Sequence, residues 1–222
     1  MKKYIAIVPF RSKSVGLPNK NLKYLDGKPL WKRAMLQALR TCDNTILSSD
    51  IKSISTQDLS KGHIFDFRPP ELANDDSLMS DVILYLINKY SLEDNHLVLL
   101  QPTSPLRSDE NIKNAIKKYE MNNYDMVFSI TKKDPSTLKY GTLENDEFIP
   151  LKDAKYCFQN RQDLPEVYAP NGAIYVFSAS SFLIDRNFPL NNIGTIVMNK
   201  ELSLDIDNFD DLTAAKRYLL DL

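Results

Sequence analysis

A chain of 222 residues, 43% of them hydrophobic and 26% charged, is long enough to bury a sizeable core. With a formal net charge of −1, nothing argues for broad binding to nucleic acid or to a membrane surface, and we expect neither as a partner. The longest apolar run, 82–87, is far too short to cross a bilayer. The two cysteines lack CxxC spacing and the N-terminus does not resemble a secretion signal, which predicts a cytoplasmic protein.

Strands and helices are predicted to alternate up to about residue 130. Continuous apolar runs are typical of buried strands, and they occur at 4–8 and 97–100. Apolar segments interrupted by polar residues also predict strands at 45–48, 64–67 and 125–130. Apolar stripes at helical spacing predict helices that begin near Pro29, near Asp81 and after Ser108, which is a good N-cap. The alternation favours a doubly wound, mostly parallel α/β sheet.

The pattern changes between about residues 132 and 170. Pro, Asp, Asn and Lys are frequent there, apolar periodicity is lost, and short strands are predicted at 141–143 and 147–151. We interpret this stretch as an excursion from a single domain spanning 1–222, used for dimerisation or as a lid. Beyond it we expect strands at 173–177 and 193–198, and a last helix that follows 202–206 and is capped by Asn208.

A basic loop follows the first predicted strand, between Pro9 and Asn21. Arg11, Lys13 and Lys20 place three cations within ten residues, and small residues among them let backbone amides approach a phosphate. The spacing is neither that of a Walker loop nor Gly-x-Gly-x-x-Gly. At the carboxyl edge of a parallel sheet the loop indicates a nucleotide site, and a solvated basic loop is the alternative.

Two carboxylates, Asp205 and Asp207, lie at the predicted end of a strand. A strand's period of two places both side chains on one face, where they repel unless a cation lies between them. Hard oxygen ligands beside a phosphate suit Mg²⁺. The alternative is that Asp207 is a turn residue before the last helix. If the metal interpretation holds, this acid pair must face the basic loop across one cleft.

Two proline-stiffened loops also fall at predicted strand ends. Arg68 opens the first loop, while Gln101 and Arg107 bound the second. At the carboxyl edge of the sheet, Gln101 and Arg107 could supply hydrogen bonds to a ligand, and Arg68 could contact a base carbonyl. The alternative is local ion pairing, in which Arg107 binds Asp109 or Glu110.

Six motifs together resemble one known family. They are Arg11-Ser12-x-Ser14-x-Gly16-Leu17-Pro18-x-Lys20-Asn21, Arg68-Pro69-x-Glu71-Leu72-Ala73, Leu100-Gln101-Pro102-Thr103-Ser104-Pro105-Leu106-Arg107, Arg161-Gln162-x-Leu164-Pro165, Pro170-Asn171-Gly172-Ala173-Ile174-Tyr175 and Asp205-Ile206-Asp207. From Ile5 to about Leu219 the chain resembles the acylneuraminate cytidylyltransferases, which are the CMP-sialic acid synthetases and their relatives acting on bacterial nonulosonic acids. The resemblance implies a Rossmann-like nucleotidyltransferase fold and a homodimer, with the excursion packed against the partner subunit.

The resemblance also implies an activity and roles for individual residues. Such enzymes join CTP to a nine-carbon 2-keto sugar acid, release pyrophosphate and supply CMP-sugars for surface-glycan assembly. By similarity, Mg²⁺ is the cofactor and would be bound by Asp205 and Asp207. The catalytic residues would be Arg11, Lys20 and Asp207. The residues binding the nucleotide would be Arg11, Ser12, Lys20, Asn21, Arg68 and Ser77. The residues binding the sugar acid would be Gln101, Arg161, Tyr168 and Asn171.

Three positions depart from the family pattern. Val15 stands where Lys is frequent before Gly16, Lys139 is displaced from its expected place after Pro135, and Ala169 replaces an Arg found in some relatives. We interpret these changes as altered acceptor choice, which leaves the acid open among sialic, legionaminic, pseudaminic and other acids. The alternatives are a relative that uses an octulosonic acid or another nucleotide, and a catalytically silent nucleotide-binding homologue.

Overall fold

The computed structural model describes residues 3–14, 16–52, 54 and 63–220. Within this part, seven strands form the central sheet, in the order β11-β7-β10-β6-β1-β4-β5. Their bounds are β1 Tyr4–Pro9, β4 Asn44–Ser49, β5 His63–Phe67, β6 His96–Leu99, β7 Met126–Lys133, β10 Val167–Ser178 and β11 Ile193–Met198. Strand β10 runs antiparallel to its neighbours β6 and β7, and the other pairs are parallel. The predicted mostly parallel sheet is confirmed.

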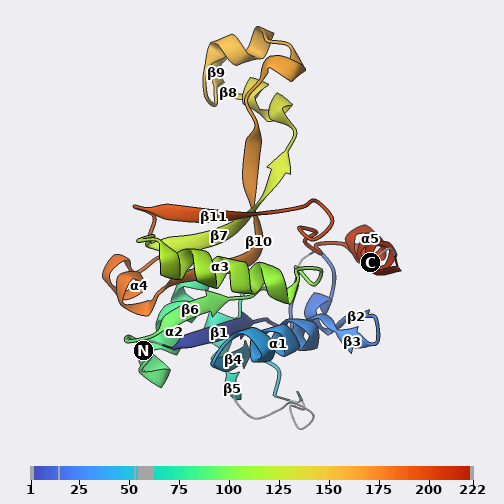
Figure 1. Ribbon diagram of the computed structural model, residues 1–222. Helices are drawn as coiled ribbons and strands as arrows, with labels where there is room; N and C mark the ends of the chain where they lie inside the picture. The colour runs from blue at the N-terminus through green and yellow to red at the C-terminus, as the bar shows by residue number, and fades with distance from the viewer. Residues whose placement is uncertain (1–2, 15, 53, 55–62, 221–222) are drawn as a thin grey trace.

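Helices cover both faces of the sheet (Figure 1). Helices α1 (Leu30–Thr41) and α3 (Asp109–Met121) pack on one face, and α2 (Met79–Tyr90) and α4 (Ala179–Asp185) pack on the other. Ser108 caps α3 as predicted: its Oγ accepts from the backbone N of Asn111 at 3.1 Å. The two short strands before α1, together with α4, are elements that the sequence patterns did not predict.

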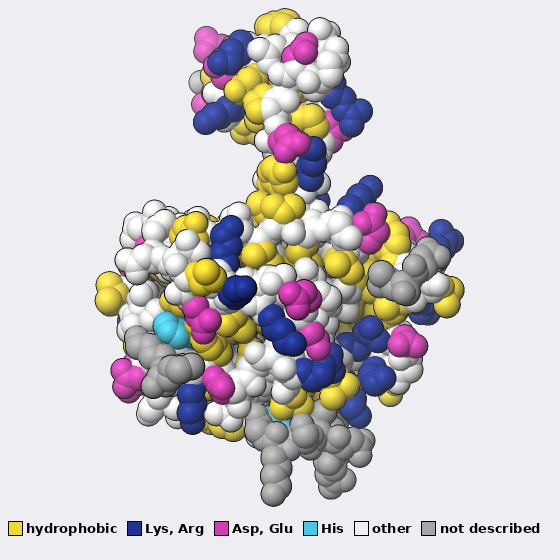
Figure 2. Space-filling model, viewed as in Figure 1, with side chains coloured by type: hydrophobic (Ala, Val, Ile, Leu, Met, Phe, Trp, Pro, Cys, Tyr) yellow, Lys and Arg dark blue, Asp and Glu magenta, His cyan; other side chains and the backbone are white. Residues whose placement is uncertain are grey.

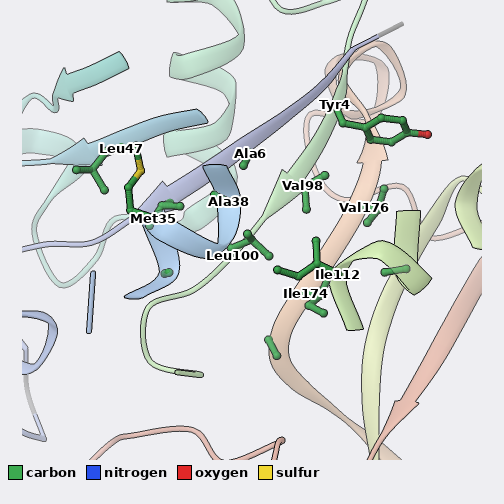
Figure 3. Close-up of a cluster of buried hydrophobic side chains, with 14 of the residues drawn as sticks. Tyr4, Ala6, Met35, Ala38, Leu47, Val98, Leu100, Ile112, Ile174 and Val176 are labelled. Carbon is green, nitrogen blue, oxygen red and sulfur yellow. The ribbon is translucent and has the colours of Figure 1, made fainter. Parts of the chain in front are cut away.

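Alternation along β1 explains why its sequence is continuously apolar. Ala6 and Val8 face the cluster that includes α1 and α3, whereas Ile5 and Ile7 face α2 and α4. Figure 3 shows the first cluster, in which the strand side chains Val98 and Ile174 lie near Ile112 of α3. Both faces of β1 are therefore buried, and the strand is fixed beneath the loop that follows it.

A third apolar cluster lies beside the carboxyl edge of the sheet. It joins helix α5 (Phe209–Leu220), the hairpin of β2 (Tyr24–Leu25) and β3 (Lys28–Pro29), and the loops around them. Its buried members are Leu17, Leu25, Leu30, Leu106, Ile206, Leu212 and Ala215. Leu17, Leu106 and Ile206 come from three segments that the sequence marked as functional, and the others come from β2, α1 and α5. The cluster therefore fixes the three segments relative to one another.

Strands β7 and β10 continue past the sheet as a two-stranded stalk, which carries a separate head at residues 134–166 (Figures 1 and 2). Backbone pairing of Val167 with Lys133 and of Tyr168 with Lys132 forms the outer stalk. The head contains the predicted short strands as β8 (Gly141–Glu144) and β9 (Glu147–Pro150). The predicted excursion is thus the head together with the outer stalk, whose polar residues hid its pairing from the apolar pattern.

The head presents several large apolar side chains to solvent. They are Leu143, Phe148, Ile149, Leu151 and Phe158. Exposed apolar groups gathered on a small unit are typical of an interaction surface. No helix in the described part of the chain is long and apolar enough to cross a membrane.

Candidate active site

The basic loop leaves β1 at the carboxyl edge of the sheet. The backbone N of Phe10 donates to the backbone O of Ser48 at 3.0 Å, which keeps the chain beside β4 for one residue past the strand. Ser12 then donates twice to the carboxylate of Asp50, from its backbone N at 2.8 Å and from its Oγ at 2.5 Å. The loop ends in a turn of 3₁₀ helix, η1 (Lys20–Leu22). Val15 lies outside the described residues.

This loop forms one wall of a cavity of about 470 Å³. The other walls come from the segments after β5 and β6 and from the segment before α5. Residues predicted to bind nucleotide, metal or acceptor line the cavity: Arg11, Lys20, Asn21, Arg68, Ser77, Gln101, Asp205 and Asp207. The basic loop and the acid pair therefore face each other across one cleft, as predicted.

Both cations assigned to the triphosphate form ion pairs at this cavity. Lys20 Nζ lies 2.8 Å from Asp207 Oδ1, and Arg11 Nη2 lies 2.9 Å from Asp75 Oδ1. Arg11 also donates from Nη1 to the backbone O of Asn74. The side chains of Asp207 and Asp75 are 70% and 63% exposed, so water weakens both pairs. A bound polyanion can replace these carboxylates without leaving a buried charge unpaired.

Arg68 lies on the inner wall and is only 3% exposed. Its Nη2 donates to the backbone O of Phe10, which ties the guanidinium to the start of the basic loop. Burial lowers the pKa of Arg68, and the carboxylates of Asp50 and Asp66 oppose this effect. The Nε of Arg68 is buried and has no hydrogen-bond partner among the described residues. A buried guanidinium that keeps unused N–H donors can recognise a ligand carbonyl or phosphate.

The remaining predicted nucleotide residues differ in their placement. Asn21 is 6% exposed and its Nδ2 donates to the backbone O of Arg11 at 3.4 Å. Ser77 Oγ lies 2.7 Å from Asn74 Oδ1 and, like Asn21, lines the cavity. Ser12 is not among the residues found to line it, because Asp50 binds both its amide and its hydroxyl.

The acid pair reaches the cavity from an irregular segment, so the predicted strand end at 202–206 is wrong. Residues 201–203 form a turn and 204–207 run without ladder pairing. The apolar side chains of Leu202, Leu204 and Ile206 pack in the cluster beside α5 instead of extending the sheet. An alternating apolar pattern indicates that one side of a segment is buried. It does not show whether that side packs in a sheet or against a helix and loops.

Ile206 anchors this segment between the two aspartates. Its side chain is fully buried and its backbone N donates to the backbone O of Thr103 at 2.8 Å. The basic loop approaches the same segment closely, since a Cβ on Gly16 would lie 2.5 Å from the backbone O of Asp207. Glycine at position 16 therefore allows the loop and the acid pair to touch.

The acid pair has the chemistry of a cation site. Asp205 Oδ1 is buried and has no hydrogen-bond partner among the described residues. Burial raises the pKa of Asp205, and the nearby carboxylate of Asp207 adds to this shift. A cation between the two would offset both penalties. The described residues contain no group of three or more His, Cys, Asp or Glu side chains arranged to hold a metal. Mg²⁺ suits such a site, because one or two carboxylates, waters and substrate phosphates complete its shell.

A second cavity, of about 1080 Å³, lies where the stalk meets the body and shares Asp205 with the first. The predicted sugar-acid residues are divided between the two cavities. Gln101 lines the first, whereas Arg161 and Asn171 line the second. Tyr168 is not in the lining found for either cavity, and its hydroxyl donates to Glu166 at 2.7 Å on the stalk.

Asn171 and Arg161 differ in how firmly they are held. Asn171 is buried; its Oδ1 accepts from Ser129 Oγ at 2.5 Å and its Nδ2 donates to Ser203 Oγ at 2.9 Å. Arg161 belongs to the head, where its 69% exposed side chain lies 2.9 Å from Asp134. The structure therefore gives Asn171 internal partners and leaves Arg161 accessible, and their roles toward a sugar acid stay predictions.

A family sequence model described as "Cytidylyltransferase" matches residues 5–207, which is most of the chain. The chain belongs to the cytidylyltransferase family. It is 34% identical over 215 residues to an N-acylneuraminate cytidylyltransferase of Streptococcus agalactiae serotype V, in an alignment covering 94% of this chain and 51% of that protein. The chain thus spans about half the length of that relative.

Relatives of similar length act on other acids, according to their names. The chain is 29% identical over 215 residues to the CMP-N,N'-diacetyllegionaminic acid synthase of Legionella pneumophila, covering 91% of this chain and 90% of that protein. It is 27% identical over 221 residues to a pseudaminic acid cytidylyltransferase of Campylobacter jejuni serotype O:2, covering 96% and 95% respectively. These relatives match almost from end to end.

Solved structures share the fold at low sequence identity. A CMP:2-keto-3-deoxy-manno-octonic acid synthetase complexed with CTP superposes with a TM-score of 0.73 at 14% identity, covering 99% of each chain. A 4-diphosphocytidyl-2C-methyl-D-erythritol synthase superposes with a TM-score of 0.65 at 9% identity, again covering 99% of each chain. The predicted Rossmann-like nucleotidyltransferase fold is confirmed.

Arg107 has neither of the roles considered from the sequence. It is fully enclosed, and its Nη1 donates to the backbone O atoms of Gln101 at 2.6 Å and Ala173 at 3.3 Å. Asp109 pairs with Arg40 instead. Burial lowers the pKa of Arg107 to about 9. Arg107 therefore holds the Gln101 loop against β10 through these hydrogen bonds. Its position in a proline-stiffened loop was the sequence feature that could have indicated this structural role.

Two acidic residues at the site were missed in the sequence. Asp50 binds Ser12, and Asp75 pairs with Arg11. A signal existed for Asp50, because it follows a strand predicted to end at the carboxyl edge of the sheet. Asp75 lies in a polar loop with a second aspartate beside it, and the pattern gave no reason to choose between them.

Proposed function

We propose that the chain transfers the cytidylyl group of CTP to a nonulosonic acid, giving a CMP-sugar and pyrophosphate. The observation that carries the proposal is a single cavity, lined by the cations Arg11 and Lys20 and by the acid pair Asp205 and Asp207. Membership of the cytidylyltransferase family supports CTP as the nucleotide. Relatives named for N-acylneuraminate, legionaminic acid and pseudaminic acid support a nonulosonic acid as the acceptor.

In this proposal the chain's residues position the reactants and neutralise charge. The anomeric hydroxyl attacks the α-phosphorus, the bond from that phosphorus to the pyrophosphate oxygen breaks, and the hydroxyl proton passes to Asp207. Arg11 and Lys20 exchange their present carboxylate partners for phosphate oxygens and stabilise the leaving pyrophosphate. Arg68 contacts the cytosine from the inner wall, and Asn21 and Ser77 orient the nucleotide.

Asp205 and Asp207 would hold Mg²⁺, which when bound supplies positive charge to the phosphate oxygens. The buried, unpartnered Oδ1 of Asp205 supports this assignment. Before the nucleotide binds, Lys20 lies 2.8 Å from Asp207 and keeps that carboxylate at the cavity.

We place the acceptor in the second cavity, next to the nucleotide. Arg161, Lys132 and Lys200 line it and offer positive charge to the acid's carboxylate. The apolar surface of the head supports a homodimer in which the partner covers the head and completes the acceptor site. The proposed setting is the cytoplasm, where the CMP-sugar feeds surface-glycan assembly. Neither nucleic acid nor membrane is a proposed partner.

The test is pyrophosphate release by the purified protein with CTP and Mg²⁺ over a panel of sialic, legionaminic, pseudaminic and octulosonic acids. We expect turnover and a CMP-sugar product with at least one nonulosonic acid, and loss of turnover when the divalent cation is chelated. Turnover confined to an octulosonic acid or to another nucleotide would contradict the acceptor or the nucleotide. CTP binding without turnover on any acid would favour the silent homologue.

A further inference from the structure

Asp50 holds the basic loop from the neighbouring strand. It follows β4 directly, and each of its carboxylate oxygens accepts one hydrogen bond from Ser12: Oδ1 from the backbone N at 2.8 Å and Oδ2 from Oγ at 2.5 Å. Strand β4 is the parallel neighbour of β1, with Ser48 in register with Pro9. The loop is therefore fixed three residues after β1 by the carboxylate side chain that follows the adjacent strand.

These contacts indicate that Ser12 links the loop to Asp50 and does not bind a phosphate directly. Its amide hydrogen and its hydroxyl hydrogen are both donated to Asp50, so neither remains for a phosphate oxygen. Ser12 is covalently joined to Arg11, whose backbone O accepts from Asn21 Nδ2 at 3.4 Å. Fixing Ser12 thus fixes the backbone that carries Arg11 and the contact that orients Asn21.

Asp50 also lies near the arginine assigned to the base. The backbone N of Arg68 donates to the backbone O of Ser49 at 2.8 Å, one residue before Asp50. The guanidinium of Arg68 donates to the backbone O of Phe10, one residue before Arg11. Among the groups facing Arg68, the carboxylates of Asp50 and Asp66 raise its pKa against the effect of burial, while Arg11 lowers it.

We propose that Asp50 is a positioning residue for the nucleotide, which acts through Ser12 to hold the phosphate-binding loop and the base-side Arg68 in one fixed arrangement. The inference rests on the proposed function, since it assumes that the cavity takes CTP. It extends that function by naming a residue that touches neither substrate nor metal and still sets the affinity for the nucleotide.

The chain supplies a matched control at the opposite end of the same strand pair. Asp43 immediately precedes β4, as Asp50 immediately follows it. Asp43 Oδ2 accepts from the backbone N of Tyr4 at 2.8 Å, at the start of β1. Asp43 ties the start of β1, and Asp50 ties the loop after β1, to the two ends of β4 through backbone amides. Neither aspartate is in the lining found for the cavity. A purely structural role would make the two interchangeable.

The experiment compares Asp50→Asn with Asp43→Asn by calorimetric titration of CTP with Mg²⁺ and by thermal unfolding of the same samples. We expect both variants to unfold at a lower temperature than the wild type. We expect Asp50→Asn alone to raise the Kd for CTP, by about tenfold, because one of two charge-assisted bonds to the loop is lost. In turnover assays the KM for CTP should rise with it while the KM for the acid stays unchanged.

Ser12→Ala provides a milder variant in case Asp50→Asn fails to fold, since it removes only the hydroxyl bond. Its Kd for CTP should rise by a few-fold, and the double variant should show less than the product of the two single effects. Unchanged CTP affinity in Asp50→Asn, or an equal loss in Asp43→Asn, overturns the inference. A wild-type protein that does not bind CTP at all overturns the proposed function as well, so the two failures are distinguishable.

Discussion

The cavity proposed to bind the nucleotide and the head differ in how deeply their side chains are buried. At the cavity, Arg68 is 3% exposed and Asn21 is 6% exposed, and both side chains have partners within the chain. In the head, Phe158 is 92% exposed and Leu143 is 73% exposed. Buried side chains lose little conformational entropy when a ligand binds. Covering exposed apolar side chains lowers the free energy, because their surface is removed from water. Under the proposed function, one chain supplies the whole nucleotide site, whereas the acceptor site depends on what covers the head.

The largest effect on turnover is expected from Asp207→Asn, which tests the proposed metal site in the cavity. The exposed side chain contributes little to folding, so the variant should have a near wild-type melting temperature. Turnover should fall by roughly 100-fold or more, because a charge is lost where the phosphate charge develops. Asp210→Asn, three residues further along the chain in α5, is the control and should keep its kcat. A near wild-type kcat in Asp207→Asn would remove it from the metal site.

Arg11→Ala tests whether the same cavity holds the triphosphate of CTP. Productive CTP binding should weaken by roughly 2–4 kcal/mol, the value of a charge-assisted partner of a phosphate. The measurement is kcat/KM for CTP. Arg33→Ala removes a partly buried arginine that pairs with Asp26 away from this cavity and should leave this ratio unchanged. If kcat/KM for CTP is also unchanged in Arg11→Ala, Arg11 does not hold the triphosphate.

Phe158→Asp tests the head. If a second copy covers the head, a charge at this position should shift the protein from dimer to monomer in light scattering and raise the KM for the acid by about tenfold. CTP binding should persist, because the nucleotide cavity lies within one chain. Ile184→Asp is the control, since Ile184 is 83% exposed on α4 of the body. An oligomeric state that is the same in both variants would favour the lid interpretation of the head.

The smallest effect is expected from Asp75→Asn. Its carboxylate now pairs with Arg11 and competes with the triphosphate, so its removal should lower the KM for CTP by about two- to fivefold. Asp76→Asn is the control, as the next residue in the same loop, where no ion pair to Arg11 is found. A raised KM in Asp75→Asn would show that Asp75 helps to bind the nucleotide.

Much of this protein could be read from residues close together in the sequence. The continuous run of β1 predicted burial on both faces, Ser108 predicted the start of α3, and the spacing of Arg11 and Lys20 predicted a phosphate loop. Each of these signals depends on a few neighbouring residues, because strand alternation, helix capping and turn formation are local effects. The ordered motifs also predicted the fold family that the comparisons show.

Only the tertiary structure decided which distant residues meet. The pattern at 202–206 predicted a strand, but its apolar side chains pack beside α5, so the acids reach the cavity from an irregular segment. The contact of Asp50 with Ser12 spans 38 residues, and that of Arg107 with Ala173 spans 66. Local preference cannot encode such contacts, because they form only when separate strands and helices pack against one another and bring their ends to the same edge of the sheet.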